Sequence, residues 1–347
     1  MTDMADTLES VGTMNGTVGN ATSLLTICIP TYNRRKDLEE CLASVLPQAE
    51  SLGVGVAVSD NCSSDDTWHL LETLKQQYPW MQIVRHTRDI GYRDNLTGVV
   101  LSSHAHYVWP IGDKLVLLPG ALEFVVAELV RLHPDAVIVN SLNEVASTAE
   151  KIYSSPQSCL AELGWHTTHL GATILPRQAF VDALHVQPLS GDFPQVVALF
   201  SYLASVSVPQ VLFSPLVLIQ WGKSVTERHV ASYYADRTLA VWGRNWYDAV
   251  MSLPALYSTN GKQQAIKSLS EHTTGIVRLW HLMWLRAKGE LTLRRLNADW
   301  VPLQAAIASP WWLVAVISVI PRWMLRPILY VHPRRLLRVM RRELRLP

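Results

Sequence analysis

Residues 24–46 read LLTICIPTYNRRKDLEECLASVL, and they place an apolar run of strand length directly before a helical pattern. The run LLTICI is typical of a strand that is buried on both faces. Beyond the polar turn, apolar side chains recur at the three- and four-residue spacing of one helix face: Leu38, Cys41, Leu42 and Val45. This stretch predicts a strand followed by an amphipathic helix, with Asn33 as the helix N-cap.

The same alternation continues to about residue 140. Apolar runs at 55–60, 82–86, 106–111 and 136–140 predict four more strands, and amphipathic patterns between them predict helices. Residues 229–295 have helical patterns throughout, with a break expected at Asn260-Gly261. Strands that alternate with helices predict an α/β fold with a mostly parallel sheet covered on both faces, followed by a helical C-terminal extension.

Polar residues follow three of these strands. Thr31 to Asn33 follow the first strand, Asp60 and Asn61 the second, and Asp113 and Lys114 the fourth. Because ligands bind beyond the carboxyl ends of parallel strands, we expect these residues to meet at one edge of the sheet.

Four stretches together resemble the family 2 glycosyltransferases of the GT-A fold: TICIPTYNRRKDLEECLASVLPQ, VAVSDNCSSDDTWHLL, RDIGYRDNLTGVV and YVWPIGDKLVLLPGAL. They occur in the order and at the approximate spacing of that family, and the resemblance covers roughly residues 24–225. Within the family, the chain is most similar to bacterial O-antigen and exopolysaccharide transferases, including the abequosyltransferase-like branch.

The resemblance implies a nucleotide-diphosphate sugar as donor, bound by residues at the predicted edge of the sheet. Thr31 and Asn33 match positions that receive the nucleotide, and Asp60, with Asn61 beside it, matches the carboxylate that accepts hydrogen bonds from the base or ribose. The alternative for Asp60 is a turn former that bonds its own backbone. Arg93 and Asn95 either face the donor or cap the following helix.

The stretch GDKL, residues 112–115, stands where the family usually has consecutive aspartates that hold Mg²⁺ or Mn²⁺ against the donor diphosphate. Asp113 matches the first acid, whereas Lys114 and Leu115 replace acids, and Leu115 has no metal-binding atom. Three hypotheses follow. Asp113 holds the cation with water and diphosphate as the other ligands; Lys114 places its ammonium against the diphosphate; or the site is inactive.

An inverting transferase also needs a general base near the acceptor hydroxyl. By position, Asp192 in SGDFPQVVALF matches the acid that family members place at the acceptor cleft. The alternative is an acid that merely caps the helix after it. Glu144 and His169 are weaker candidates for the base.

The last 47 residues differ from the rest of the chain. They contain eight Arg, no Lys and one Glu, a net charge of +7 in a chain whose total is +1. Trp300, Trp311, Trp312 and Trp323 precede a basic amphipathic pattern, which is typical of a helix lying in a membrane interface. The alternative is a helix packed on the catalytic domain with a solvated Arg face. Nucleic acid is not expected as a partner, because no nucleic-acid-binding motif accompanies the charge.

These patterns predict a disordered tail over 1–22, a GT-A catalytic domain over 23–225, a helical extension over 226–299 and a membrane-associating segment over 300–347. The tail has no basic start or apolar core of a signal peptide. Cys28, Cys41, Cys62 and Cys159 lack metal-ligand spacing and are expected to be reduced thiols.

The sequence favours a peripheral enzyme on the cytoplasmic face of a bacterial inner membrane. It would move a sugar from a nucleotide-diphosphate donor to a glycan linked to a polyprenyl diphosphate, in surface polysaccharide synthesis. The alternative from another class is a pseudo-transferase that keeps the fold and acts as a partner or scaffold.

Overall fold

The computed structural model describes residues 24–186, 191–228, 237–272, 279–307 and 309–330. The predicted tail at 1–22 and residues 331–347 of the predicted membrane-associating segment lie outside this described part. The described chain forms two compact units. Unit 1 contains residues 24–228 and Leu253–Ser258, and unit 2 contains 237–252 and the residues from Thr259 to Tyr330.

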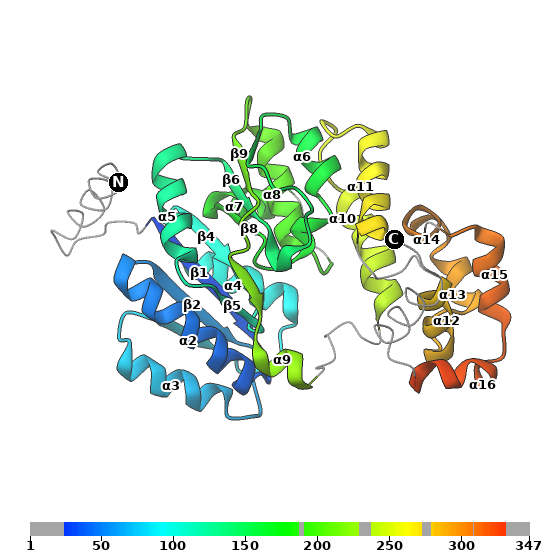
Figure 1. Cartoon of the computed structure of the whole chain (residues 1–347), viewed down its shortest axis with the longest axis horizontal. Helices are drawn as coiled ribbons and strands as arrows, with labels where there is room; N and C mark the ends of the chain where they lie inside the picture. The colour runs from blue at the N-terminus through cyan, green and yellow to red at the C-terminus, as the bar shows by residue number, and fades with distance from the viewer. Residues whose placement is uncertain (1–23, 187–190, 229–236, 273–278, 308, 331–347) are drawn as a thin grey trace. The chain divides into compact units, whose positions relative to one another are not determined.

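An eight-stranded mixed sheet forms the centre of unit 1, in the order β3-β2-β1-β4-β8-β6-β9-β7 (Figure 1). Strands β3, β2, β1 and β4 are mutually parallel, and so are β6 and β9, whereas β8 and β7 run antiparallel to their neighbours. In chain order the strands are β1 Leu25–Thr31, β2 Gly55–Asp60, β3 Gln82–Arg85, β4 Tyr107–Pro110, β6 Ala136–Val139, β7 Lys151–Tyr153, β8 Thr173–Pro176 and β9 Val211–Ser214. The five strands predicted from the sequence are confirmed.

Helices cover both faces of this sheet. Helix α2 packs against α3 and α5 on one face. On the other face, α4 packs on β1 and β2, α7 packs against α4, and α8 packs against α7 (Figure 1). The helices of unit 1 are α2 Arg35–Leu52, α3 Thr67–Gln77, α4 Tyr92–Ser102, α5 Ala121–Leu132, α6 Pro156–Leu163, α7 Arg177–Val186, α8 Pro194–Ser205 and α9 Lys223–Arg228, with short turns η2 Ser141–Asn143 and η3 His166–Thr168.

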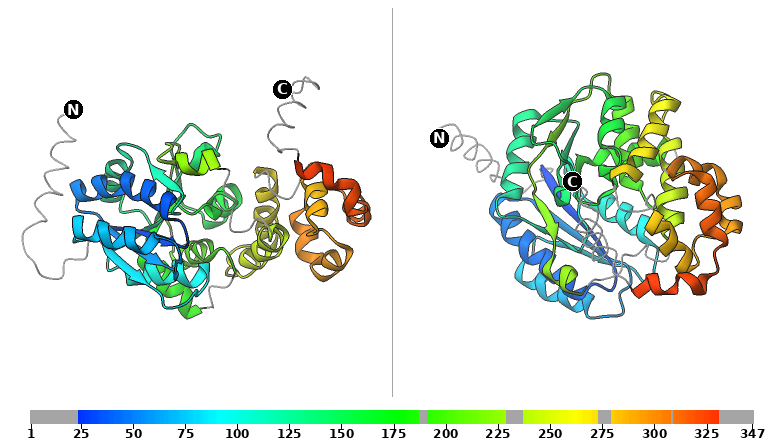
Figure 2. Two further views of the ribbon diagram at one scale, coloured as in Figure 1. Left: turned by 90° about the horizontal axis from the view of Figure 1, so that it is seen from below. Right: turned by 45° about the vertical axis from the view of Figure 1, so that its right-hand side comes forward.

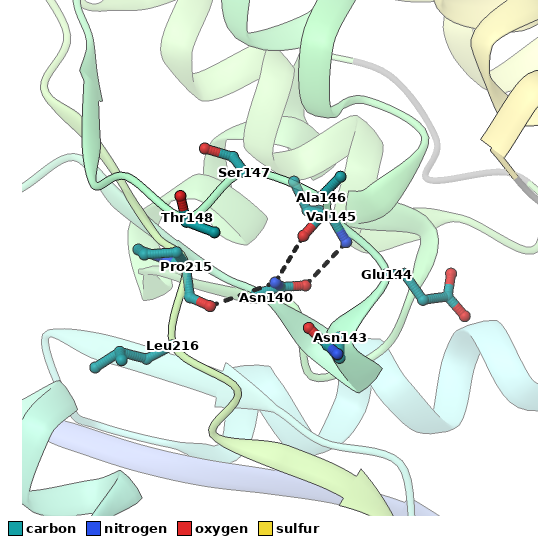
Figure 3. A pocket seen from close by; sticks show the side chains of 9 residues that line it. All are labelled: Asn140, Asn143, Glu144, Val145, Ala146, Ser147, Thr148, Pro215 and Leu216. Carbon is teal, nitrogen blue, oxygen red and sulfur yellow. Dashed lines mark hydrogen bonds between the residues drawn. The ribbon is translucent and has the colours of Figure 1, made fainter.

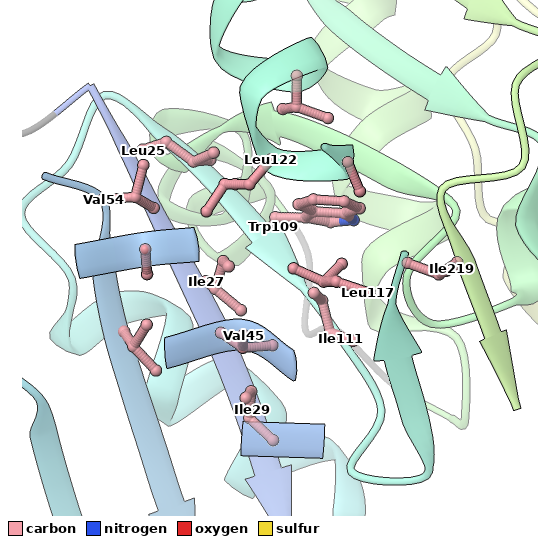
Figure 4. Close-up of a cluster of buried hydrophobic side chains, with 14 of the residues drawn as sticks. Leu25, Ile27, Ile29, Val45, Val54, Trp109, Ile111, Leu117, Leu122 and Ile219 are labelled. Atoms are coloured by element: carbon pink, nitrogen blue, oxygen red, sulfur yellow. The ribbon is translucent and has the colours of Figure 1, made fainter. Parts of the chain in front are cut away.

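The main core lies between β1, β4 and helix α2 (Figure 4). Leu25, Ile27 and Ile29 alternate along β1 toward α2 and are fully buried, as the period of a strand requires. Trp109 of β4 is also fully buried, and its indole Nε1 donates to the Gly171 carbonyl at 2.9 Å. The apolar run that opens the chain therefore anchors both the sheet and its first helix.

A two-stranded antiparallel ribbon, β5 Leu115–Leu117 with β10 Ile219–Trp221, was not predicted. Each strand has three residues, too few to show periodicity, and about a hundred residues separate them. Gly171 has a φ of 105°, and a Cβ there would lie 2.6 Å from Ile219 and 3.0 Å from Leu115. Glycine thus lets the loop before β8 approach the ribbon closely.

Unit 2 is helical, which confirms the helical C-terminal extension. Its elements are η4 Leu239–Asn245, α10 Trp246–Met251, α11 Thr259–His272, α12 Leu279–Lys288, α13 Leu293–Ala298, α14 Trp300–Ala306, α15 Trp311–Val319, α16 Arg322–Leu325 and η5 Arg326–Tyr330 (Figure 2). The break expected at Asn260-Gly261 is wrong, because both residues lie in the first turn of α11, where the helix N–H groups need no internal partner.

Within the described residues, no single helix has both the length and the apolar composition to cross a membrane. Helices α14 and α15 reach that composition only as a pair, and the chain bends by 117° between them.

Candidate functional site

The carboxyl ends of β2, β1 and β4 meet at one edge of the sheet, as the strand order requires. Thr31 and Asp60 are register partners on β1 and β2, and the Asn61 N–H donates to the Thr31 carbonyl at 3.0 Å. On the other side, the Thr31 hydroxyl donates to Asp113 Oδ2 at 2.8 Å. We call this set the ligand edge: Thr31, Asn33, Asp60, Asn61, Asp113 and Lys114.

Asp113 is the carboxylate of the ligand edge whose environment is most unusual. Burial raises its pKa to about 6, although the Thr31 hydrogen bond and the nearby charges of Arg34 and Lys114 act in the opposite direction. Asp37 contributes a further, raising effect. Asp113 is therefore ionised at neutral pH but sits close to its titration range.

The two residues after Asp113 point to different places. Leu115 begins β5 and is 4% exposed, so its side chain belongs to the core. Lys114 is partly exposed, and its carbonyl accepts the Gly222 N–H at 2.9 Å. This bond brings the start of α9, with Lys223, beside the Asp113 turn.

The residues of this site fit a metal ion only in part. Across the described residues, no group of three or more His, Cys, Asp or Glu side chains is placed to hold a cation. Asp113 supplies a single carboxylate, one of whose oxygens already accepts the Thr31 hydroxyl. A divalent cation at Asp113 would therefore take its other oxygen ligands from water and from a bound diphosphate.

Asp60 is fully buried, and its oxygens are engaged by its own loop. Oδ1 accepts the Ser63 N–H at 3.2 Å and also the Ser63 hydroxyl, while Oδ2 lies 3.5 Å from Arg85 Nε. These contacts support the turn-forming alternative for Asp60. Its carboxylate braces the loop that shapes the edge.

Asn33 and Asn61 also hold loops together. Asn33 has a φ of 52°, and its Oδ1 accepts the Ser64 N–H at 2.8 Å, which links the loops after β1 and β2. The predicted N-cap role is wrong, because helix α2 begins one residue later and Arg34 occupies the cap position. Asn61 donates to Asp89 at 2.6 Å and accepts the Ile90 N–H at 2.9 Å, so it positions the loop before α4.

Arg93 and Asn95 differ in exposure. Arg93 is exposed and forms a two-point contact with Asp94, at 2.6 and 3.0 Å. Asn95 is 3% exposed, and its amide donates to the carbonyls of Thr31 and Ser59 at 3.4 and 3.2 Å. Its Oδ1 has no hydrogen-bond partner in the described part of the chain. Neither side chain caps α4, whose N-cap is Gly91.

A second set of contacts at this edge was missed from the sequence. Glu40 of α2 accepts the N–H groups of Lys223 and Ser224 at 2.6 and 3.0 Å, and Asp37 accepts the Ser224 hydroxyl at 2.6 Å. Burial opposes ionisation of Glu40, but these hydrogen bonds outweigh it and lower its pKa. A Cβ at Gly222 would lie 2.8 Å from the Glu40 carboxylate. These contacts could not be predicted because the local sequence GKS at 222–224 gives no sign that it bonds Asp37 and Glu40, some 180 residues earlier.

The three predicted base candidates come from the other half of unit 1. Asp192 is partly exposed and lies one residue before the N-cap of α8, which is Phe193. At the start of α8, Gln195 donates to the Thr168 carbonyl at 3.2 Å, next to His169. His169 Nε2 lies 3.5 Å from Glu144 Oε2. Burial lowers the pKa of His169 to about 3, so this contact is between a neutral imidazole and Glu144, not a salt bridge.

A cavity of about 420 Å³ opens at the carboxyl ends of β6 and β9. Asn140 braces it by bonding both the N–H and the carbonyl of Val145 and the carbonyl of Pro215 (Figure 3). The Glu144 carboxylate points away from Pro215 and Leu216 in this view. The volume lies within the range of about 300–1,000 Å³ that small-molecule sites occupy. The lining residues are Asn140, Asn143, Glu144, Val145, Ala146, Ser147, Thr148, Pro215 and Leu216.

Residues 26–180, which contain the ligand edge, match the model of glycosyl transferase family 2. This part of the chain is similar to the family 2 glycosyltransferases. Its mixed sheet, flanked by helices, has the GT-A fold of S. aureus TarS residues 1–349, with a TM-score of 0.53, 13% identity and coverage of 88% of this chain and 86% of that one. A second structure of the same TarS fragment holds UDP-GlcNAc, with a TM-score of 0.50, 14% identity and the same coverage of both chains.

Two curated relatives of this glycosyltransferase domain are transferases. Abequosyltransferase RfbV of Salmonella typhimurium is 32% identical over 101 residues, which cover 28% of this chain and 30% of that protein. Dolichol-phosphate mannosyltransferase of Pyrococcus furiosus is 33% identical over 126 residues, covering 36% of this chain and 31% of that protein. The matched region thus spans about a third of the length of each relative.

Proposed function

We propose that this protein is an inverting glycosyltransferase that uses a nucleotide-diphosphate sugar. The observation that carries the proposal is the contact between Thr31 and Asp113, which places a carboxylate and the neighbouring Lys114 at the ligand edge of a family 2 domain. A diphosphate needs positive charge, and a leaving nucleotide needs it more as the glycosidic bond breaks. The Asp113 turn lies among cationic residues, since Arg34 and Lys114 both influence its ionisation.

The donor is a nucleotide sugar, in line with the UDP-GlcNAc that TarS holds on the same fold. Asp60, Asn61 and Asn33 act by shaping the loops that receive the nucleotide, because their polar atoms are already bonded within those loops. Thr31 positions the Asp113 carboxylate through its hydroxyl.

The negative charge on the diphosphate would be met by the Lys114 ammonium and by a cation that Asp113 would hold. A Mg²⁺ or Mn²⁺ ion held by Asp113 and the diphosphate would offset charge on the leaving nucleotide. Lys114 would add its ammonium, since Lys binds phosphate as a point charge. With Lys114 and Leu115 in place of the second and third acids, part of the charge stabilisation that a metal would supply comes from the Lys114 ammonium in this proposal.

Asp192 is the general base in this proposal. It lies outside helix α8 and is partly exposed, so it is accessible to an acceptor hydroxyl. Inversion needs one base on the acceptor side and no covalent intermediate. The cavity at the ends of β6 and β9 offers room for part of a glycan acceptor.

The acceptor is a glycan linked to a polyprenyl diphosphate, used in surface polysaccharide synthesis on the cytoplasmic face of the inner membrane. The similarity to abequosyltransferase RfbV and the apolar, Arg-rich C-terminal region support this choice. The competing proposal is a pseudo-transferase, which the replacement of two acids by Lys114 and Leu115 favours.

A thermal-shift screen of the full chain against UDP-, GDP-, CDP- and dTDP-sugars tests the donor. One nucleotide class should raise the melting temperature, because a ligand that binds the native state stabilises it. Release of the nucleoside diphosphate from that donor, with a lipid-linked glycan extract as acceptor, then tests transfer. Binding without release would support the pseudo-transferase, and no shift with any of these donors would contradict the proposed transfer reaction.

A further inference from the structure

Helix α15 in unit 2 is apolar on both of its faces. On the inner face, Val314 and Ile317 are 0% and 2% exposed and pack in a core with Leu282 and Leu285 of α12. The outer face carries Trp312, Val316 and Val319, which are 68%, 50% and 54% exposed. Their spacing of four and three residues puts them on one stripe, which we call the α15 outer face. A helix that is apolar all round needs an apolar environment on both sides.

More exposed apolar side chains lie on the elements that flank α15 in the chain. Trp323 and Met324 of α16 are 70% and 54% exposed, and Trp300 of α14 is 42% exposed. Trp300 packs edge-on against Trp311, with ring centroids 4.4 Å apart. Tryptophan favours the boundary between water and lipid, because its ring is apolar and its indole N–H is polar.

The charges of this region are suited to an anionic partner. Between Leu279 and Tyr330 the chain has two acids, Glu290 and Asp299, and both are buried, at 8% and 7% exposure. Asp299 bonds Arg244 at 2.6 Å, and Glu290 accepts the Leu239 N–H at 3.2 Å. No carboxylate from this stretch is therefore exposed to repel anionic lipid. The sequence after Tyr330 adds six Arg and one Glu.

We infer that the α15 outer face docks into the interfacial region of an anionic bilayer while α15 stays folded on unit 2. Helix α15 has nine residues, about 14 Å of helix, against about 30 Å of hydrocarbon in a bilayer. The bent pair of α14 and α15 is longer, but Leu303, Val314 and Ile317 are buried in the core of unit 2. Crossing the membrane would strip these side chains from that core. Lying in the interface keeps it intact and covers the outer face.

This inference deepens the proposed peripheral location and rests on it, but not on the proposed transfer reaction. Full-length protein is floated with vesicles of phosphatidylcholine alone or mixed with phosphatidylglycerol. The paired substitution Val316→Asp and Val319→Asp is compared with Val208→Asp, which alters an exposed valine of unit 1 that is 67% accessible. We expect the protein to bind the mixed vesicles and the pair to lose binding about tenfold or more, whereas the control binds as wild type.

Depth of insertion separates docking from spanning. A fluorophore on Val316→Cys in a Cys62→Ser background labels one site, because the other three cysteines are buried. Quenchers at a shallow lipid position should quench it more than quenchers near the bilayer centre. Strongest quenching at the centre, or no quenching at all, would overturn the inference. If vesicles bind and no nucleotide sugar shifts the melting temperature, the docking face stands and the proposed function fails.

Discussion

The ligand edge and the α15 outer face handle their side chains in opposite ways. At the ligand edge, polar groups that looked available in sequence are mostly bonded within their own or neighbouring loops, as Asn33, Asp60 and Asn61 show. On α15, which the sequence places in a membrane-associating segment, apolar groups are exposed, as Trp312 and Val319 show. A buried polar group must find a partner inside the protein, whereas an exposed apolar stripe is best covered by a partner outside it. Polar residues that are already bonded inside the protein therefore build a site, whereas exposed residues are the ones available to contact a ligand or partner.

The largest effect is expected at Asp192, which lies one residue before the N-cap of α8. Asp192→Asn should lower the transfer rate by about 10²–10⁴-fold, the contribution usual for a general base, and leave donor binding unchanged. Single-turnover transfer and donor titration measure the two quantities. Glu144→Gln is the matched variant and should transfer at a near-normal rate. If Glu144→Gln fails and Asp192→Asn does not, the base is Glu144.

At Asp60 the comparison predicts a loss of stability. Asp60→Ala should reduce the free energy of unfolding by about 3 kcal/mol without any ligand, because Ser63 and Arg85 lose a buried partner. Urea unfolding of the apo protein measures this. A variant that unfolds like wild type but no longer binds donor would show that Asp60 serves the nucleotide directly.

Lys114 tests which positive charge the diphosphate uses. We expect Lys114→Ala to lower donor turnover by about 10–100-fold, while EDTA lowers the rate of the wild type by less, since the ammonium carries part of the charge. Lys36→Ala, which alters an exposed lysine near the start of α2, is the control for a lost lysine. If EDTA abolishes the transfer rate and Lys114→Ala leaves it unchanged, a metal ion alone neutralises the diphosphate charge.

Two valines on opposite faces of α15, Val314 and Val316, test whether its inner face is buried and its outer face exposed in solution. Val314→Ala should cost about 2 kcal/mol, because it removes buried methyl groups and leaves a cavity. Val316→Ala should change the free energy of unfolding by no more than about 0.5 kcal/mol in the absence of lipid. Thermal unfolding of both variants measures the difference. Equal costs would mean that the outer face is covered in solution.

The smallest effect concerns the pH dependence of stability at Asp113. Its folded pKa, about 6, is raised above the ordinary value of 3.8, so the folded state gains relative stability at low pH and loses it as the pH rises through 6. Asp113→Asn does not titrate and should therefore be more stable than wild type at pH 8, by about 1–2 kcal/mol after allowing for partial exposure. The gap should close at pH 4. A gap that is constant with pH would contradict the raised pKa.

Much of the fold of residues 24–140 could be predicted from local patterns. The second strand was expected at 55–60 and is observed as Gly55–Asp60, because an uninterrupted apolar run ends at a polar turn. The ribbon of β5 and β10 and the contact of Glu40 with Ser224 were not predicted. These depend on segments far apart in the chain, and three-residue strands have no period to detect.

The sequence by itself determined the alternation of strands and helices up to about residue 140, the resemblance to family 2 glycosyltransferases, and which residues follow those strand ends, since each is written in local spacing and residue type. Only the tertiary structure decided what those residues do with their polar atoms. Leu115 is buried in the core, Asn33 bonds a neighbouring loop, Asp60 bonds its own loop, and Asp113 has one oxygen beyond the one that accepts the Thr31 hydroxyl. The same holds for α15, where the tertiary structure buries Val314 and leaves Trp312 exposed. Hydrogen-bond partners and burial depend on which residues are neighbours in space, and a local sequence pattern does not identify those neighbours.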